Sequence, residues 1–210
     1  MWTKKYITSA ALITVAILAI GGLLWNSSTV GLKPDFNATA DASWCRGAED
    51  APIVIDVYPD FQCPICVDKE LMVVQALSDY QGKIRMVYHH YPDTGLSEKL
   101  AEALEAAGEQ GKFWELHDRI IQDVPDDMPA LRALAKQIRL DMKQFNEALD
   151  TGKFTAKVRL DKQKAISAGV KHVAVFINGK LYGKSPGELT DLYQEIDEEL
   201  RKVADTRVGN

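Results

Sequence analysis

Two cysteines separated by two residues lie where an apolar run ends and a helical pattern begins. Residues 52–58 form a short run rich in β-branched side chains, which is typical of a buried strand. After Cys63 and Cys66, apolar residues recur at helical spacing over residues 67–77. The sequence therefore predicts an α/β fold in which a Cys-Pro-Ile-Cys motif joins a strand to the first turn of a helix.

The position of this motif favours thiol chemistry. The unpaired N–H groups at a helix N-terminus stabilise an anion, so Cys63 should ionise more readily than an ordinary thiol. We predict that Cys63 is the nucleophile and that Cys66, one turn on and less exposed, resolves the mixed disulfide. Pro64 suits a first helical turn because it has no N–H group to leave unpaired. We expect Pro64 and Ile65 to border the reactive thiol.

A structural disulfide and one half of a zinc site are the alternatives for the two cysteines. A closed zinc site needs two such pairs or added histidines, and the sequence holds no second Cys-x-x-Cys motif. With three cysteines in 210 residues, the chain is not a disulfide-dense scaffold. The place of the motif therefore favours a redox role, and we assign neither a metal site nor a bound cofactor.

The rest of the chain alternates between strand and helix patterns. Residues 84–90 predict a second strand and residues 173–177 a third, followed by the hairpin signal Asn178-Gly179. Ser-Pro-Gly-Glu at 185–188 has the residues that open a last helix. Between the second and third strands the pattern predicts helices over 97–110, 112–121, 128–140, 141–149 and 154–168.

The N-terminal residues predict a membrane anchor. Lys4 and Lys5 precede an apolar run from Tyr6 to Trp25, and about 20 apolar residues span a bilayer as a helix. The two lysines favour a cytoplasmic N-terminus with the rest of the chain exported. We predict that residues 1–25 form a single membrane-spanning anchor, with a cleaved signal peptide as the alternative. Residues 26–50 lack periodicity and predict a linker.

The charge balance argues against nucleic acid as a partner. The chain has 25 Lys plus Arg against 30 Asp plus Glu, a formal charge of −5. Binding to nucleic acid draws most of its affinity from basic residues that neutralise phosphates. We therefore predict a mildly acidic exported domain that does not bind nucleic acid.

Three segments of the chain together resemble the signatures of a known family. They are Asp-Phe-Gln-Cys-Pro-Ile-Cys at 60–66, Gln-Gly-Lys-Phe-Trp-Glu-Leu-His-Asp at 110–118 and Phe-Ile-Asn-Gly-Lys at 176–180. In this order they resemble the DsbA-like thioredoxin-fold proteins, and the resemblance runs from about Ala51 to Val203. It implies a thioredoxin-like fold over residues 51–205, with a helical insertion at about 95–168.

The resemblance also implies a reaction and partners. Members of this family exchange thiols and disulfides with exported cysteine-containing proteins. Members that act as oxidants depend on a quinone-linked membrane partner of the DsbB or vitamin K epoxide reductase type. The resemblance therefore predicts a thiol–disulfide oxidoreductase on the periplasmic or extracellular side of the cell membrane.

One departure from the family pattern lies before the third strand. Family members carry a cis-proline there, and aligning back from the hairpin places Val173 at that position and His172 before it. A cis bond without proline costs about 2.5–4 kcal/mol, so we expect a trans peptide and an altered substrate groove. His172 is then either a partner of the Cys63 thiolate, a third metal ligand beside Cys63 and Cys66, or a surface turn residue.

Other polar residues near the motif have simpler interpretations. We expect His89 and His90 to form a solvated strand end, and His117 to lie in an amphipathic helix that builds the core of the insertion. We expect Asp60 and Glu70 to be solvated, with a buried carboxylate that passes the Cys66 proton as the alternative.

Three functions remain open from the sequence. The first is a membrane-anchored thiol–disulfide oxidoreductase, which forms, breaks or isomerises disulfides. The second is a metal-binding or metal-delivery protein that uses Cys63, Cys66 and His172. The third is a redox-inactive interaction subunit of a membrane complex. Cys45 is the third cysteine, and we consider a role as an intermolecular bridge or an extra resolving thiol.

Overall fold

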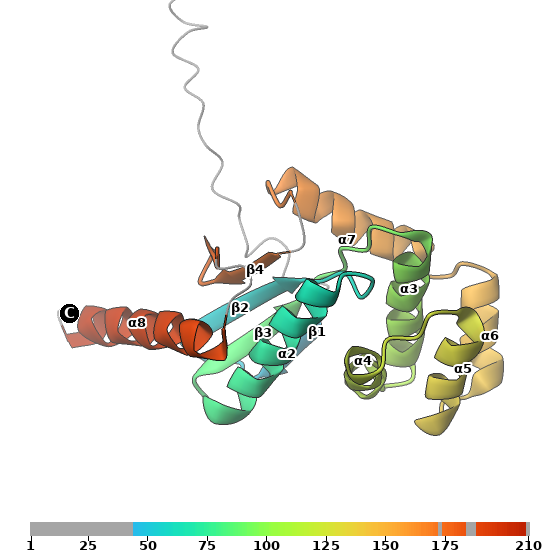
Figure 1. Ribbon diagram of the computed structural model, residues 1–210, viewed down its shortest axis with the longest axis horizontal. Coiled ribbons are helices and arrows are strands. Elements are labelled where there is room, and N and C mark those ends of the chain that lie inside the picture. The colour runs from blue at the N-terminus through green and yellow to red at the C-terminus, as the bar shows by residue number, and fades with distance from the viewer. Residues whose placement is uncertain (1–43, 172–173, 184–187, 209–210) are drawn as a thin grey trace, which may run out of the picture. The chain divides into compact units, whose positions relative to one another are not determined.

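The computed structural model describes residues 44–171, 174–183 and 188–208 (Figure 1). In chain order its elements are β1 (Trp44–Gly47), β2 (Ile53–Tyr58), α2 (Pro64–Asp79), β3 (Ile84–Tyr88), α3 (Gly95–Glu109), α4 (Phe113–Gln122), α5 (Met128–Gln137), α6 (Met142–Asp150), α7 (Thr155–Ser167), β4 (Ala174–Ile177), β5 (Lys180–Leu181) and α8 (Leu189–Val208). The predicted succession of a strand–helix–strand unit, a helical insertion, a hairpin and a last helix is confirmed.

The strands form one mixed sheet in the order β1-β3-β2-β4-β5. Strands β2 and β3 are parallel and are joined through α2, whereas β4 lies antiparallel to β2 and β5 antiparallel to β4. The hairpin turn between β4 and β5 uses positive φ angles at Asn178 (48°) and Gly179 (75°). This agrees with the Asn-Gly signal, because such a turn needs left-handed conformations that these residues adopt most readily.

Alternation along β2 and β4 divides the core between the two faces of the sheet. Ile55, Val57 and Val175 belong to a large cluster that also takes in residues of α2, the insertion and α8. Tyr58 and Phe176, one position further on, belong to a smaller cluster with residues near the end of α7. Successive side chains of a strand point to opposite faces, so α2 and α7 pack on opposite faces of the sheet.

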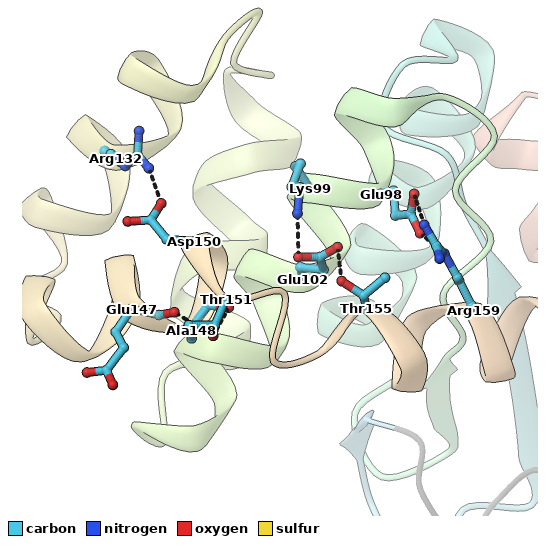
Figure 2. Close-up of polar contacts among 10 residues, drawn as sticks. All are labelled: Glu98, Lys99, Glu102, Arg132, Glu147, Ala148, Asp150, Thr151, Thr155 and Arg159. Atoms are coloured by element: carbon cyan, nitrogen blue, oxygen red, sulfur yellow. Dashed lines mark hydrogen bonds and ion pairs between the residues drawn. The ribbon is translucent and has the colours of Figure 1, made fainter.

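Polar contacts tie the helices of the insertion together (Figure 2). Glu102 of α3 is 1% exposed and accepts hydrogen bonds from Lys99 of the same helix and from Thr155 of α7, each at 2.8 Å. Arg132 of α5 donates to Asp150 of α6 at 3.1 Å. The predicted helical insertion is confirmed, and these contacts fix α7 against α3 and α5 against α6.

Strand β1 lies inside the range that the sequence predicts as a linker, and here that prediction is wrong. Trp44 stacks on Phe113 with ring centroids 4.3 Å apart and donates from Nε1 to Glu105 at 2.9 Å. Arg46 forms a two-bond ion pair with Asp118, at 2.9 and 2.7 Å. Four residues are too few to show the alternation of apolar and polar side chains that predicts a strand. The contacts with residues distant in the sequence are what hold β1 in the sheet.

Several predictions fall outside the described residues. They are the membrane anchor at 1–25, the linker up to residue 43, His172 and Val173, and most of the predicted opening of the last helix at 185–188. Across the part of the chain that the structure describes, no helix has both the length and the apolar content needed to cross a membrane.

Candidate active site

The two cysteines occupy the start of α2. Cys63 is the N-cap residue, and its carbonyl accepts from the N–H groups of Cys66 (2.9 Å) and Val67 (3.1 Å). Pro64 is the first residue of the helix. Cys63 and Cys66 are joined in a disulfide with their Cα atoms 5.2 Å apart. Cys63 therefore lies at the positive end of the α2 dipole, which stabilises negative charge on its sulfur after reduction.

The two sulfur-bearing residues differ in exposure. Cys63 is half-buried, whereas Cys66 is 8% exposed. Pro64 and Ile65 between them face solvent, and Ile65 is 52% exposed. An incoming thiolate can therefore approach Cys63 more readily than Cys66.

Asp60 fixes the loop that leads into α2. Its carbonyl accepts from the Cys63 N–H at 3.0 Å. Its carboxylate accepts from the N–H groups of Gln62 at 2.8 Å and of Asp93 at 3.0 Å. Asp60 is 5% exposed, so the prediction that it is solvated is wrong. The backbone donors satisfy the buried carboxylate and hold the loop against the segment after β3.

A cavity of about 240 Å³ lies beside the disulfide, and we call it the disulfide cavity. The end of β2, the first turns of α2 and the start of β4 line it. The lining residues are Val57, Tyr58, Pro59, Cys63, Ile65, Cys66, Lys69, Glu70, Ala174 and Val175. The cavity is therefore mainly apolar, with both cysteines and one carboxylate in its wall.

Glu70 is also buried, contrary to prediction, with 2% exposure. His117 donates from Nε2 to Glu70 Oε1 at 2.8 Å and from Nδ1 to Asp118 Oδ1 at 3.0 Å. Burial disfavours the charged imidazole, but Glu70 and Asp118 outweigh this effect and raise the pKa of His117. His117 lies in the insertion's core as predicted, but as one member of a charged chain that begins in the disulfide cavity.

The prediction of a solvated strand end at His89 and His90 is wrong. His89 is 0% exposed and donates from Nε2 to Asp56 at 3.0 Å, while His90 is 2% exposed and donates to Glu105 at 2.8 Å. The segment after β3 lies under α7, whose Asp161 accepts from the His90 N–H at 2.7 Å. Both imidazoles are therefore buried because the insertion covers this end of the strand.

One hypothesis from the sequence is a metal site in which His172 is the third ligand beside Cys63 and Cys66. Among the described residues, no three or more histidine, cysteine or acidic side chains come together as a metal site. His172 and Val173 lie outside those residues. A role for His172 beside the cysteines therefore stays a prediction.

Cys45 lies in β1, where it is half-buried and pairs in register with Val87 of β3. Its carbonyl accepts from Trp114 Nε1 at 3.1 Å. The structure thus places the third cysteine at the edge of the sheet beside β3, on an element separate from the helix that carries Cys63 and Cys66.

The fold and the Cys-x-x-Cys site define an α/β protein of the thioredoxin class. A family model described as thioredoxin matches residues 39–197. This covers more than half of the chain, so the protein belongs to the thioredoxin family.

Relatives at the sequence level are of two kinds. A Na(+)/H(+) antiporter NhaA 3 of Salinispora tropica is 34% identical over 145 residues, which is 67% of this chain and 22% of the antiporter. The chain thus spans about a fifth of the length of that relative. A probable disulfide bond formation protein D of Bacillus cereus is 26% identical, over 96% of this chain and 100% of that protein.

Solved structures share the fold. The oxidised form of BdbD from Bacillus subtilis has a TM-score of 0.66 and 20% identity, over 75% of this chain and 92% of that one. The alpha-DsbA1 protein of Wolbachia pipientis has a TM-score of 0.70 and 19% identity, over 79% and 94%. The DsbA-like thioredoxin fold expected from the sequence signatures is confirmed.

Proposed function

We propose that this protein is an extracytoplasmic thiol–disulfide oxidoreductase that acts through Cys63 and Cys66 on exported cysteine-containing proteins. One observation carries the proposal: a disulfide at the N-terminus of α2 joins Cys63, which is half-buried, to Cys66, which is buried. This asymmetry directs attack to Cys63 and keeps Cys66 as the internal leaving group.

The reaction follows from this geometry. A substrate thiolate attacks Cys63 Sγ, the Cys63–Cys66 bond breaks, and Cys66 leaves as a thiolate that takes up a proton. A second substrate thiolate then attacks the substrate sulfur of the mixed disulfide and releases the Cys63 thiolate. The substrate loses two electrons and gains a disulfide, while the protein gains two electrons and becomes a dithiol.

The structure and the relatives favour the oxidising direction. The N–H groups at the start of α2 stabilise a thiolate at Cys63, which is its N-cap residue. A stabilised thiolate lowers the free energy of the reduced form, so the disulfide becomes a stronger oxidant. The names of the Bacillus relatives, which refer to disulfide bond formation, agree with this direction.

We further propose that residues 1–25 hold the domain at the outer face of the cell membrane. Support comes from the uncharged apolar run after Lys4 and Lys5. A membrane partner that passes electrons to a quinone would then regenerate the disulfide. In intact cells, a membrane-impermeant maleimide should label reduced Cys63, and labelling should disappear in a variant that lacks residues 1–25 because that variant is not exported.

The redox equilibrium of Cys63 and Cys66 is the direct test. The full chain, with Cys45→Ser, is equilibrated in metal-free glutathione buffers, trapped by alkylation and measured by intact mass. We expect a reversible disulfide whose reduction potential is higher than that of the glutathione couple. We expect Cys63→Ser to abolish thiol–disulfide exchange. Failure to form the disulfide at any glutathione ratio would overturn the proposal and favour metal binding by the two thiols.

A further inference from the structure

Lys69 carries a charge in the wall of the disulfide cavity that no other side chain neutralises. It lines the cavity together with both cysteines and is partly exposed. Within the described residues it takes part in no ion pair and no hydrogen bond. An ammonium group on a flexible stem can turn toward an anion nearby. Lys69 is therefore available to a negatively charged group that enters the cavity.

The rest of the cavity wall makes this charge selective. Apart from the cysteines, Lys69 and Glu70, the lining side chains are apolar or aromatic: Val57, Tyr58, Pro59, Ile65, Ala174 and Val175. An ion pair that forms against such a wall is screened less by water than a pair on the open surface. A carboxylate that contacts Lys69 there is therefore attracted, whereas a second ammonium group is repelled.

The two acidic residues beside Lys69 in the sequence do not cancel its charge in the cavity. Asp68 is exposed, but it is not among the residues that line the cavity. Glu70 does line the cavity, but its side chain is 2% exposed and accepts a hydrogen bond from His117. Lys69 is thus the charged side chain of this wall that an incoming substrate can contact.

Ile65 lies one helical turn before Lys69 on the same face of α2. Both residues line the cavity, and Ile65 is 52% exposed. Side chains four residues apart on a helix have Cβ atoms about 5–6 Å apart. In an extended peptide, side chains two residues apart point to the same side and are separated by about 7 Å. An extended substrate can therefore place an apolar side chain on Ile65 and the next side chain on that side near Lys69.

We propose that Lys69 selects protein substrates in which an acidic residue lies close to the reactive cysteine. The preferred segment is extended and contains an apolar residue and, two positions from it, an aspartate or a glutamate. The apolar side chain contacts Ile65 and the carboxylate pairs with Lys69 while the substrate thiolate attacks Cys63. The inference rests on the proposed exchange reaction and names the class of substrate that the same site takes.

The overall charge of the chain does not favour such a substrate. The formal charge is −5, so the long-range field of the protein repels an acidic segment more than a basic one. A preference for acidic substrates must therefore come from contact with Lys69. This reasoning separates selection in the cavity from general electrostatic attraction.

The test compares peptides that differ in a single side chain. Each contains one cysteine, a leucine and, two residues from the leucine, a glutamate, a glutamine or a lysine. One set places this variable residue before the cysteine and a second set places it after. Excess reduced peptide is mixed with the oxidised full chain, which carries Cys45→Ser throughout, and loss of the Cys63–Cys66 disulfide is followed by acid quenching and intact mass. Each peptide is compared between protein variants, because this comparison cancels the reactivity of the peptide thiol itself.

Lys69→Met removes the charge and keeps most of the apolar stem. In at least one peptide set it should slow reduction by the glutamate peptide about fivefold. It should leave the glutamine peptide nearly unchanged and should not slow the lysine peptide. Lys69→Arg should keep the preference for glutamate, and Lys69→Glu should reverse the preference in favour of lysine.

Lys136→Met is the matched control, since it also replaces a lysine by methionine. Lys136 is exposed in α5 and does not line the disulfide cavity. The rates of all peptides should be the same in this variant as in the unsubstituted protein. Equal losses in Lys69→Met and Lys136→Met would assign the effect to overall charge and overturn the proposal.

Two further outcomes separate substrate selection from the exchange reaction. If Lys69→Met changes the rates of the glutamate, glutamine and lysine peptides equally in both sets, Lys69 acts on the cysteines and the proposed selection is overturned. Reduction of the unsubstituted protein by mercaptoethanol but by none of the peptides would also overturn the selection. Failure of mercaptoethanol and of every peptide to reduce the Cys63–Cys66 disulfide would instead refute the proposed function.

Discussion

The indole ring of Trp44 lies against Gly108, in the space that a side chain at position 108 would fill. Trp44 belongs to β1 and Gly108 to α3, so this contact joins the edge of the sheet to the helical insertion. Glycine inside a helix is unfavourable relative to alanine by about 1 kcal/mol. The close approach of the indole is the physical reason for a glycine at this position.

Gly108→Ala should therefore destabilise the protein, although alanine is the better helix former. An added Cβ overlaps the Trp44 ring, and overpacking costs about 1–3 kcal/mol. Urea unfolding measures the change. Gly95→Ala is the control in the same helix, because no atom lies within 4 Å of its added Cβ; it should be neutral or stabilising by up to about 1 kcal/mol. Equal stability of the two variants would contradict this account of Trp44.

Stability should fall as the pH rises above the ordinary pKa of histidine. Burial lowers the pKa of His89, but Asp161 and Asp56 outweigh it and raise that pKa above its ordinary value of 6.5. The pKa of His117 is raised in the same way by Glu70 and Asp118. The folded state then binds more protons than the unfolded state above pH 6.5, so the stabilisation is complete below this pH and is lost as the pH rises through the folded-state pKa.

Urea unfolding at a series of pH values between about 6 and 9 checks the sign of this dependence. We expect the free energy of unfolding to decrease steadily over the range. His89→Gln should unfold more easily at the lower pH values and show a shallower decrease. A free energy that rises or stays constant with pH would show that these imidazoles are not held in the charged form.

Asn178→Ala should destabilise the protein more than Asn178→Gly. Its φ of 48° lies in the left-handed region, and its Oδ1 accepts from the Val54 N–H at 2.8 Å. Asn178→Gly keeps the conformation and loses the hydrogen bond, at a cost of about 1 kcal/mol. Asn178→Ala also strains the backbone, which adds about 1–2 kcal/mol. Thermal or urea unfolding that ranks the two variants equally would show that the turn relaxes.

Ile65 should contribute to binding of protein substrates without contributing to stability. It is 52% exposed and lines the disulfide cavity beside Cys63. Ile65→Asn should lower kcat/KM for a cysteine peptide with apolar neighbours about tenfold, which is the loss of about 1.4 kcal/mol of apolar contact. Exchange with glutathione, which lacks such side chains, should change little.

Leu160→Asn is the matched control for this substitution. Leu160 is 55% exposed in α7 and is not among the residues that line the disulfide cavity. Leu160→Asn should leave kcat/KM for the cysteine peptide and the rate of exchange with glutathione unchanged. Equal loss of peptide exchange in the two variants would assign the effect of Ile65→Asn to general surface polarity and remove Ile65 from the substrate surface.

Local patterns in the sequence determined the main elements. The β-branched run before Cys63, the helical spacing after Cys66 and the Asn178-Gly179 pair all correspond to elements found in the structure. These features depend on residues a few positions apart, because helix, strand and hairpin conformations follow from local sterics and side-chain periodicity. The place of the Cys-x-x-Cys motif at a helix start was predictable for the same reason.

The burial of the polar residues and the existence of β1 depend on contacts between segments that are distant in the sequence. Glu70 meets His117 across 47 positions and Trp44 meets Glu105 across 61. From the sequence alone, a carboxylate or an imidazole near a strand end is predicted to be solvated, because burying a charge without a partner is unfavourable. Each becomes tolerable when the fold brings its partner to hydrogen-bond distance. Local sequence patterns thus predict the position of the two cysteines at the start of α2, whereas the packing of the insertion against α2 and the sheet determines which charged side chains lie near them.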